Sequence, residues 1–449
     1  MTYKYFPHSD ADVQAMLERC HLRSLDDLYS DVPAELQHQG DYELPSSMSE
    51  VELRRYFDEL GSNNEQLTCF VGAGCYDHYS PAVVQSIVSR SEFLTSYTPY
   101  QAEISQGTLQ YIFEYQSMMA ELTGMEVSNA SMYDGATATA EAMMMAVSAA
   151  KKRNRVLVSD TLNPAVRRVV DTYAKFHGIV VDSIAQAGGV TDRADLEAKL
   201  AAGDVAGVIV ATPNFYGILE DFTGWADLCH EHKALLIMNC VASALGVVKT
   251  PGEWGADIAV GDGQSLGLPM NFGGPYVGFL CTSKKLIRKM PGRIVGATHD
   301  VDGKRAFVLT LQAREQHIRR EKATSNICSN ESLMALYVTV YMALMGRDGL
   351  REVNQLGYSG AHYLAQELCA TGKFEMAFPD KPFLNEFAVR TQLNIDELQE
   401  ACVMDGIQAG VKIADDTLLL CVTENRSRIE IDELIDQVKQ FIEEEEETL

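Results

Sequence analysis

The chain has 449 residues, 46% hydrophobic and 22% charged, which is a globular composition and enough length for two or three packed units. Its formal net charge of −26 argues against nucleic acid and anionic membrane as partners, because both attract positive surfaces. Ten cysteines occur singly, without metal-ligand spacing, and indicate reduced thiols, a cytoplasmic location and no metal site. The amino terminus has no apolar signal segment and the uncharged run Ala234 to Val248 is too short to span a bilayer, so neither export nor membrane insertion is expected.

Residues 1–68 are polar and rich in charge. Helical stretches are predicted near Ala11–Leu22 and Ser49–Leu60. The apolar periodicity of this region is too weak for a hydrophobic core of its own. We therefore expect a helical arm that packs on something larger.

Residues 69–330 alternate short β-branched runs with helical stretches, which predicts a parallel sheet covered by helices on both faces. One helix is expected to begin at Asn163-Pro164, an N-cap followed by proline. In such sheets ligands bind beyond the carboxyl ends of the strands. The predicted strands are Val156–Ser159, Ile179–Ser183, Val208–Ala211, Leu235–Asn239, Ile258–Gly261 and Tyr276–Cys281.

Residues 331–449 are predicted to form a small α+β domain that ends in a solvated acidic tail, Glu443–Glu447. A large α/β domain followed by a small α+β domain is the layout of aminotransferase-like pyridoxal-phosphate enzymes of fold type I, an analogy at the level of fold alone. The predicted elements are a long helix from Ser332 to Met345, strand Glu386–Arg390, helix Ile395–Asp405, strand Thr417–Val422 and a last helix behind the capping box Ser427-x-x-Glu430.

The segment Met132–Ala140 leads into a predicted helix through Gly135 and Thr137. Small and hydroxyl residues at a helix start leave backbone N–H groups that can bind an anion. The same residues can also do no more than cap the helix. The sequence leaves both interpretations open.

The ends of two predicted strands lack the residues that pyridoxal-phosphate chemistry requires. An enzyme of this fold needs an acid after one strand to pair with the pyridinium nitrogen and a lysine after the next to bind the cofactor covalently. The first position is Asn239, and residues 261–274 contain no lysine. Lys284 and Lys285 follow the next strand and come one element too late. We therefore expect no covalent cofactor site in this chain.

Several strings of residues closely resemble the amino-terminal half of glycine decarboxylase, the P-protein family of the glycine cleavage system. The resemblance covers essentially the whole chain, and its most specific strings are Tyr97–Gly107 (YTPYQAEISQG) and Gln316–Cys328 (QHIRREKATSNIC). Further matching strings are Phe70–His78, Leu122–Ser131 and Gly292–Gly296.

The resemblance implies the α subunit of the split form of that family, a chain that is not active alone. Its register places Ser265 where the β subunit carries the lysine, and Asn239 where it carries the aspartate. The implied partners are this β subunit, which holds pyridoxal phosphate, the lipoylated H-protein, and glycine. The implied reaction is decarboxylation of glycine, with release of CO2 and transfer of the aminomethyl group to the lipoyl group.

The turn Tyr97–Gly107 is the first candidate for a contribution to the shared active site. It gathers phenol, hydroxyl, amide and carboxylate groups around the rigid Thr98-Pro99 step. Our hypothesis is that this turn lines the partner's cofactor pocket, and the alternative is a packed turn whose polar groups are satisfied internally. The candidate residues are Tyr97, Thr98, Tyr100, Gln101, Glu103 and Ser105.

The second candidate is a basic cluster in an otherwise acidic chain. Guanidinium groups can bind the carboxylate of glycine or a cofactor phosphate with two parallel hydrogen bonds. The alternative is that these cations pair with neighbouring acids. The candidate residues are Arg314, His317, Arg320 and Lys322, with Ser325 and Asn326 as hydrogen-bond donors close behind them.

There are two alternatives to a shared active site. The chain could be a catalytically silent scaffold that stabilises the β subunit or docks the H-protein. It could also be an independent pyridoxal-phosphate enzyme, but that would require the missing lysine.

Overall fold

A computed structural model describes residues 7–38, 40, 42–150, 152–271 and 273–448 of the chain. By its internal contacts the chain divides into two compact units, Met1–Glu65 and Gln66–Leu449. Among the described residues, no helix is long and apolar enough to cross a membrane.

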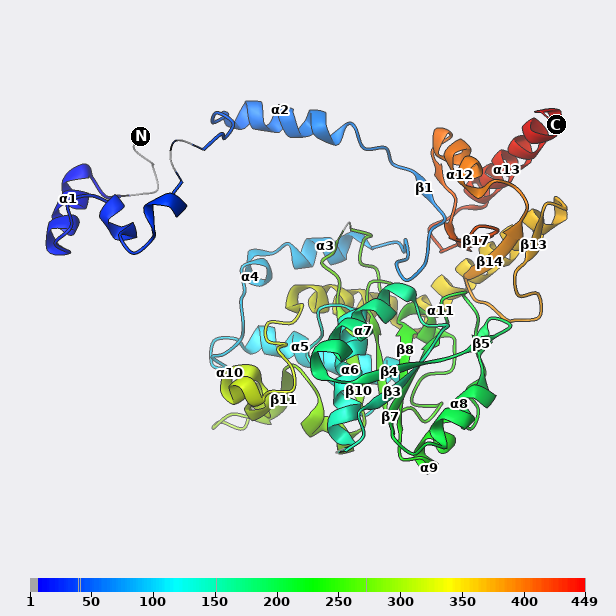
Figure 1. The fold of residues 1–449 in the computed structure, drawn as a ribbon, viewed down its shortest axis with the longest axis horizontal. Coiled ribbons are helices and arrows are strands. Elements are labelled where there is room, and N and C mark those ends of the chain that lie inside the picture. Colours follow the sequence, from blue (N-terminus) through cyan, green and yellow to red (C-terminus); the bar gives the residue numbers. More distant parts are fainter. Residues whose placement is uncertain (1–6, 39, 41, 151, 272, 449) are drawn as a thin grey trace. The chain divides into compact units, whose positions relative to one another are not determined.

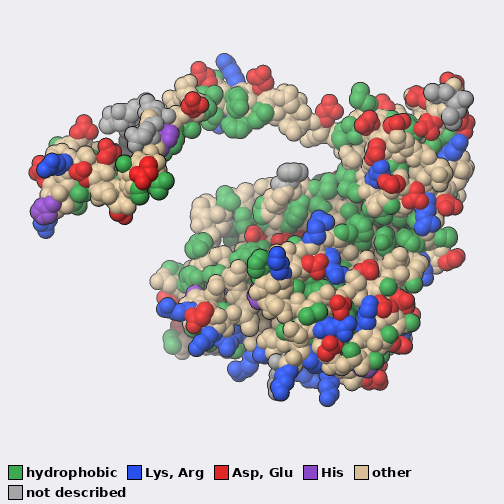
Figure 2. Space-filling model, in the orientation of Figure 1, with side chains coloured by type: hydrophobic (Ala, Val, Ile, Leu, Met, Phe, Trp, Pro, Cys, Tyr) green, Lys and Arg blue, Asp and Glu red, His purple; other side chains and the backbone are tan. Residues whose placement is uncertain are grey.

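The first unit consists of α1 (Asp10–Arg19), α2 (Glu50–Gly61) and two short 3-10 helices, η1 (Asp26–Tyr29) and η2 (Ala34–Leu36). Both predicted helices are thus confirmed. Among the described residues of this unit, Leu17 is the one buried hydrophobic side chain. The apolar side chains of α2 at i, i+3, i+4 and i+7 are between 46% and 58% exposed, and Figure 2 shows hydrophobic groups on the surface of this helix. They are Leu53, Tyr56, Phe57 and Leu60.

The second unit contains a seven-stranded sheet, of which Figure 1 labels β3, β4, β7, β8 and β10. The strand order is β2-β10-β9-β8-β7-β3-β4. All six predicted strands are present, within a few residues of their expected bounds. The strands are β2 (Val127–Ser128), β3 (Arg155–Ser159), β4 (Val180–Ile184), β7 (Val205–Thr212), β8 (Leu235–Val241), β9 (Ile258–Asp262) and β10 (Gly278–Thr282).

Helices cover both faces of this sheet, as the sequence predicts, because the side chains of a strand alternate between its faces. Along β7, Ile209 packs in a core with α6 and α7, whereas Val208 and Val210 pack in a core with α5, α9 and the first half of α11. The covering helices are α3 (Ala82–Val88), α5 (Gln106–Thr123), α6 (Gly135–Ala149), α7 (Pro164–His177), α8 (Arg193–Leu200), α9 (Trp225–Glu231) and α11 (Ser332–Ala370).

The sheet is parallel-rich as predicted, and β10 departs from the parallel direction of its other long strands. β10 runs antiparallel to β9, with Gly278 opposite Asp262 and Thr282 opposite Ile258. A parallel return needs a crossover of a dozen or more residues, usually a helix. The connection here is rich in glycine and proline, and its described residues, 263–271 and 273–277, form turns and loops instead.

Smaller elements complete the large sheet's surroundings. The loop between β10 and α11 carries a two-stranded ribbon of β11 and β12, which packs against α5. The elements are α4 (Ser91–Leu94), β5 (Gln186–Ala187), β6 (Val190–Thr191), η3 (Ser243–Gly246), η4 (Lys284–Lys289), β11 (Ile294–His299), β12 (Arg305–Thr310), η5 (Gln312–Arg314), α10 (Gln316–Arg319) and η6 (Arg320–Lys322).

A four-stranded antiparallel sheet in the order β13-β14-β17-β16 forms a second core with the later part of α11 and with α12 and α13. The predicted strands and helices of this region are confirmed, while β13 and β16 were not predicted. The elements are β1 (Thr68–Cys69), β13 (Phe374–Met376), β14 (Glu386–Thr391), α12 (Ile395–Met404), β15 (Ile407–Gln408), β16 (Val411–Ala414), β17 (Thr417–Cys421) and α13 (Arg428–Thr448).

The helix ends follow the local signals in the sequence. The side chain of Asn163 accepts a hydrogen bond from the N–H of Ala165 and caps α7. Ser427 and Glu430 form the predicted capping box of α13, with reciprocal bonds of 2.6 and 3.3 Å. α11 is kinked at Gly346, where φ is 58°, one residue after the predicted end of the helix.

Candidate functional site

A pocket of about 350 Å³ lies at the carboxyl edge of the large sheet, where the fold predicts a ligand. The ends of β7, β8 and β9 form its floor, and the starts of α6 and α7 and residues 73–76 form its walls. Both residues expected at the cofactor positions, Asn239 and Ser265, line this pocket.

The side chains of Asn239 and Ser265 are used inside the chain. Asn239 Nδ2 donates a hydrogen bond to Thr139 Oγ1 at 2.8 Å. Ser265 Oγ accepts a hydrogen bond from the backbone N–H of Ser243 at 3.0 Å. Neither side chain can supply the carboxylate or the amine that the cofactor needs.

The start of α6 is capped by carboxylates of this chain. Asp134 Oδ1 accepts a hydrogen bond from the N–H of Thr137 at 2.7 Å, and Asp262 Oδ2 accepts one from the N–H of Gly135 at 2.9 Å. A helix start offers only a few free N–H groups. Of the two interpretations left open by the sequence, the contacts favour the cap, because two internal carboxylates occupy donors that an anion would use.

A third carboxylate, Glu386 at the start of β14, also lines the pocket. It accepts hydrogen bonds from the N–H of Ala73 at 2.5 Å and from the hydroxyl of Tyr76 at 3.0 Å. Burial raises the pKa of Glu386 to about 7, although both hydrogen bonds act to lower it. Burial likewise raises the pKa of Asp262 to about 6, against the hydrogen bonds from Gly135 and Gln264.

This chain's pocket does not fit pyridoxal phosphate. Among the described residues that line it there is no lysine, arginine or histidine, while three carboxyl groups are present. A phosphate group would meet negative charge there instead of free N–H groups. Lys284 and Lys285 follow the antiparallel strand β10, whose last residue, Thr282, lies opposite the first residue of β9. They therefore lie at the amino-terminal ends of the parallel strands, away from the pocket.

The residues predicted from the Tyr97–Gly107 and Gln316–Cys328 strings lie outside this pocket, and some of them form two other groups. In the first, the ring of Tyr100 makes an edge-on contact with His317, with ring centres 6.0 Å apart. The hydroxyl of Tyr100 lies 3.9 Å from the sulfur of Cys328 and 3.4 Å from Arg293 Nη2. Desolvation and then the Cys328 thiol raise the pKa of Tyr100.

The second group lines a cavity of about 340 Å³ between α6, α7 and residues 316–326. Arg320, Ser325 and Asn326 all line it. Ser325 donates a hydrogen bond to Glu141 Oε1 at 2.8 Å, and burial raises the pKa of Glu141 to about 7. The cavity therefore places an arginine, two hydrogen-bonding side chains and a buried carboxyl group around one space.

Arg314 does not join either group. Its guanidinium donates to the backbone carbonyls of Leu311 at 3.1 Å, Gly292 at 3.0 Å and Met290, so it holds loops together. Glu103 and Lys322 are exposed.

The rest of the Tyr97–Gly107 turn divides between backbone structure and exposed side chains. Tyr97 is 79% exposed, whereas the carbonyls of Thr98, Gln101 and Ser105 accept backbone hydrogen bonds within the turn and the start of α5. The turn therefore presents Tyr97 outward on an ordered backbone.

Several residues of these sites were not predicted. Arg293 and Glu315, an ion pair beside Tyr100 and His317, stand inside or beside strings that mark the family resemblance, and Glu141 and Cys328 were not predicted either. Asp262 and Glu386 are separated by 127 and 313 residues from Gly135 and Ala73, their hydrogen-bond donors, so no local pattern pairs them.

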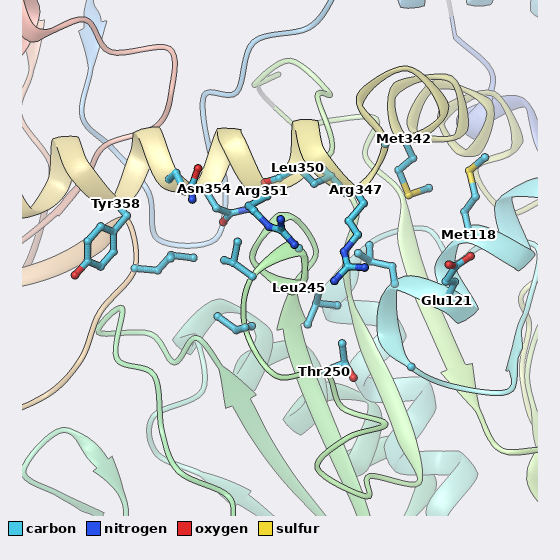
Figure 3. A pocket seen from close by; sticks show the side chains of 18 of the residues that line it. Met118, Glu121, Leu245, Thr250, Met342, Arg347, Leu350, Arg351, Asn354 and Tyr358 are labelled. Carbon is cyan, nitrogen blue, oxygen red and sulfur yellow. Dashed lines mark hydrogen bonds between the residues drawn. The ribbon is translucent and has the colours of Figure 1, made fainter.

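A groove of about 1230 Å³ runs beside α11, and in Figure 3 Arg347 and Arg351 point into it from the helix, toward Leu245 and Thr250. None of the candidate residues from the sequence is among the described residues that line this groove. Among the described residues, no group of three or more His, Cys, Asp or Glu side chains is placed to hold a metal ion.

Comparison with known proteins places this geometry in a family. A family model described as glycine cleavage system P-protein matches residues 3–438. A Moorella thermoacetica protein named probable glycine dehydrogenase (decarboxylating) subunit 1 is 50% identical over 437 residues, which cover 96% of this chain and 98% of that protein.

Solved structures agree with the predicted fold. The crystal structure of glycine decarboxylase (P-protein) of the glycine cleavage system, in inhibitor-bound form, is 41% identical, with a TM-score of 0.89 over 98% of this chain and 100% of that one. An alanine–glyoxylate aminotransferase from Nostoc sp. shares the fold at 16% identity, with a TM-score of 0.60 over 91% of this chain and 98% of that one. The aminotransferase-like fold is thus confirmed.

Proposed function

Since the chain belongs to the glycine cleavage system P-protein family, we propose that it is the lysine-free subunit of a two-subunit glycine dehydrogenase (decarboxylating). With its partner it would decarboxylate glycine, release CO2 and pass the aminomethyl group to the lipoyl group of the H-protein. One observation carries the proposal. The pocket at the carboxyl edge of the sheet holds Ser265, Asn239 and three carboxyl groups in place of the residues that would bind a cofactor.

In this proposal, pyridoxal phosphate is held by the β subunit and supplies the electron sink for loss of the carboxylate. The proposal also includes a cytoplasmic location, which fits ten cysteines that are all free thiols.

The contribution of this chain to the shared site is proposed to come from the Tyr97–Gly107 turn and the loop before α11. Tyr97 and Tyr100 are 79% and 53% exposed, and Ile104 beside them is 77% exposed. Large exposed side chains grouped within one short turn are of the kind that a partner surface buries. The exposure favours a surface that a partner covers, with His317 in contact with Tyr100 at this surface. Arg320, Ser325 and Asn326 line the separate cavity beside α6 and α7 and are proposed as a second contribution.

A purely structural role as scaffold or H-protein docking subunit is the competing proposal. It predicts that substitutions in the Tyr97–Gly107 turn weaken assembly and leave turnover per assembled complex unchanged. A shared active site predicts the reverse, assembly intact and turnover reduced.

The test is glycine–bicarbonate exchange by the complex reconstituted from this chain, the lysine-bearing subunit and the lipoylated H-protein. Tyr97→Phe and Tyr100→Phe each remove one hydroxyl, and we expect at least one of them to slow exchange about tenfold with co-purification unchanged. Tyr79→Phe, an exposed tyrosine outside the turn, is the matched control. Normal exchange in both turn variants would contradict the shared site.

A further inference from the structure

Arg293 and Glu315 form a buried ion pair behind the exposed Tyr100 and His317. The two side chains are 2% and 3% exposed, and Arg293 Nε lies 3.7 Å from Glu315 Oε2. That distance is too long for a hydrogen bond. Nε of Arg293 and both carboxylate oxygens of Glu315 have no hydrogen-bond partner among the described residues.

A buried ion pair with this geometry contributes little to the stability of the fold. Removing two charges from water costs several kcal/mol per ion, roughly, and their attraction offsets this only with good geometry and further hydrogen bonds. A core of apolar side chains in the same space would be at least as stable. The pair therefore calls for an explanation other than folding.

Each member of the pair contacts a candidate residue of the shared site. Arg293 Nη2 lies 3.4 Å from the hydroxyl of Tyr100 and 3.6 Å from the sulfur of Cys328, and its guanidinium carbon lies 5.3 Å from the centre of the Tyr100 ring. Glu315 Oε2 lies 3.5 Å from His317 Nδ1. One buried pair thus touches Tyr100 and His317, which are far apart in the sequence.

These contacts restrict the orientations that the exposed side chains of Tyr100 and His317 can adopt. Tyrosine and histidine at a surface lose side-chain freedom when they order, which disfavours a single orientation. A guanidinium is planar and carries several donors, so it can meet a carboxylate, a phenol and a thiol at once. The Glu315 carboxylate, 3.5 Å from His317 Nδ1, restrains the imidazole by electrostatic attraction without a hydrogen bond.

We propose that Arg293 and Glu315 are positioning residues that hold the Tyr100 hydroxyl and the His317 imidazole toward the partner's active site. The proposal rests on the proposed function, because the residues have this role only if the turn and loop line a shared site. They touch neither substrate nor cofactor and act through Tyr100 and His317.

The experiment uses the reconstituted complex with three variants, Glu315→Gln, Arg293→Lys and the double variant Arg293→Met/Glu315→Leu. Gln removes the charge and keeps the shape, and Lys keeps the charge but cannot reach Glu315, Tyr100 and Cys328 together. The double variant replaces both ions by apolar groups, so it keeps a packed core even where a single variant fails to fold. Each complex is measured for assembly, unfolding midpoint, kcat and KM for glycine.

We expect the double variant to be as stable as the wild type and its kcat to fall about tenfold or more, with KM for glycine changed by less than threefold. Arg426→Lys is the matched control. Arg426 is also a buried arginine paired with an acid, Asp77 at 2.8 Å, and its loss should affect stability and leave kcat unchanged.

A second measurement separates positioning from bulk structure. In a Tyr100→Phe/His317→Ala background the double variant should lower kcat no further, because the pair acts through those two side chains. Full kcat in the double variant, or an additive loss in that background, would overturn the positioning role. Failure of the proposed function would look different, since the wild-type complex itself would show no exchange.

Discussion

At the scale of single residues, Gly135 allows the start of α6 to be capped by the Asp262 carboxylate. A Cβ built at this position would lie 2.6 Å from the backbone nitrogen and 2.9 Å from the Cβ of Asp262, and 2.8 Å from the carbonyl carbon of Gly261. Glycine is therefore required for β9 and α6 to approach closely enough for the Asp262 carboxylate to receive the N–H of Gly135.

Gly135→Ala should lower the free energy of unfolding by about 1–3 kcal/mol, because the neighbouring atoms are backbone and cannot move aside cheaply. Urea unfolding of the isolated chain measures the loss. Gly107→Ala in the first turn of α5 is the control, since nothing lies within 4 Å of its Cβ, and it should be neutral or slightly stabilising. Equal stability of the two variants would show that β9 and α6 are not in tight contact.

At the scale of elements, one side chain ties α7 to the distant loop at residues 73–76. Asn163 Oδ1 caps the helix by accepting from Ala165 at 2.8 Å, and its Nδ2 donates to the carbonyl of Ala73 at 2.7 Å. The cap and the loop that walls the pocket therefore depend on the same residue.

Asn163→Ala should cost about 2 kcal/mol, the sum of a lost cap and a lost half-buried hydrogen bond of about 1 kcal/mol each. Asn394→Ala is the matched control, because Asn394 caps α12 through Asp396 and Glu397 and its amide donates to the Glu397 side chain, an exposed bond within the same helix turn. Its loss should cost about 1 kcal/mol. Thermal and urea unfolding give both values, and an equal loss in the two variants would mean that the bond to Ala73 contributes nothing.

Local sequence signals predicted most helices and strands, but they did not predict features that depend on contacts between distant residues. Apolar periodicity located all six predicted strands of the large sheet, and the caps at Asn163 and Ser427 were readable from their neighbours. The direction of β10 was not readable, because the geometry of the connection after Asp262 sets it.

The candidate site divides in the same way. The missing lysine at Ser265 and the neutral Asn239 could be seen in the sequence. The contact of Asp262 with Gly135 and the pair of Arg293 with Glu315 join segments that only the fold brings together. Contacts between residues far apart in the chain produce no periodic pattern in the sequence, so periodicity cannot predict them.

At the scale of the whole molecule, three buried carboxyl groups tie stability to pH. Burial raises the pKa of Glu386 and Glu141 to about 7 and that of Asp262 to about 6, from ordinary values of 4.5 and 3.8. The folded chain therefore keeps protons that the unfolded chain releases. Their contribution is fully present below pH 4 and is lost as the pH rises to about 7.

Glu386→Gln should flatten this decline, because the amide does not ionise and is close to the carboxyl group in size. We expect the difference in unfolding free energy between variant and wild type to change by roughly 2–3 kcal/mol between pH 4.5 and pH 8, in favour of the variant at high pH. Urea titrations across that range measure it. Glu197→Gln, at an exposed position, is the control, and its unfolding free energy should vary with pH as that of the wild type does. The same pH dependence in Glu386→Gln would show that the buried Glu386 carboxyl group does not cause the decline.

The isolated chain should not bind pyridoxal phosphate covalently. We expect no borohydride-fixed cofactor and no visible absorbance band after the chain is mixed with the cofactor and desalted, and both signals once the lysine-bearing subunit is added. The control is that subunit alone. A fixed cofactor on the isolated chain would contradict both the pocket's chemistry and the proposed function.

The caps at the start of α6 also mean that restoring the lysine alone would not restore a cofactor site in this chain. Ser265→Lys alone would not create an enzyme, because the helix start would still be occupied by Asp134 and Asp262 and the ring nitrogen would still face Asn239. Ser265→Lys would also remove the acceptor for the N–H of Ser243. An independent catalyst would therefore require changes at several positions at once, at Ser265, at Asn239 and at the carboxylates that cap α6.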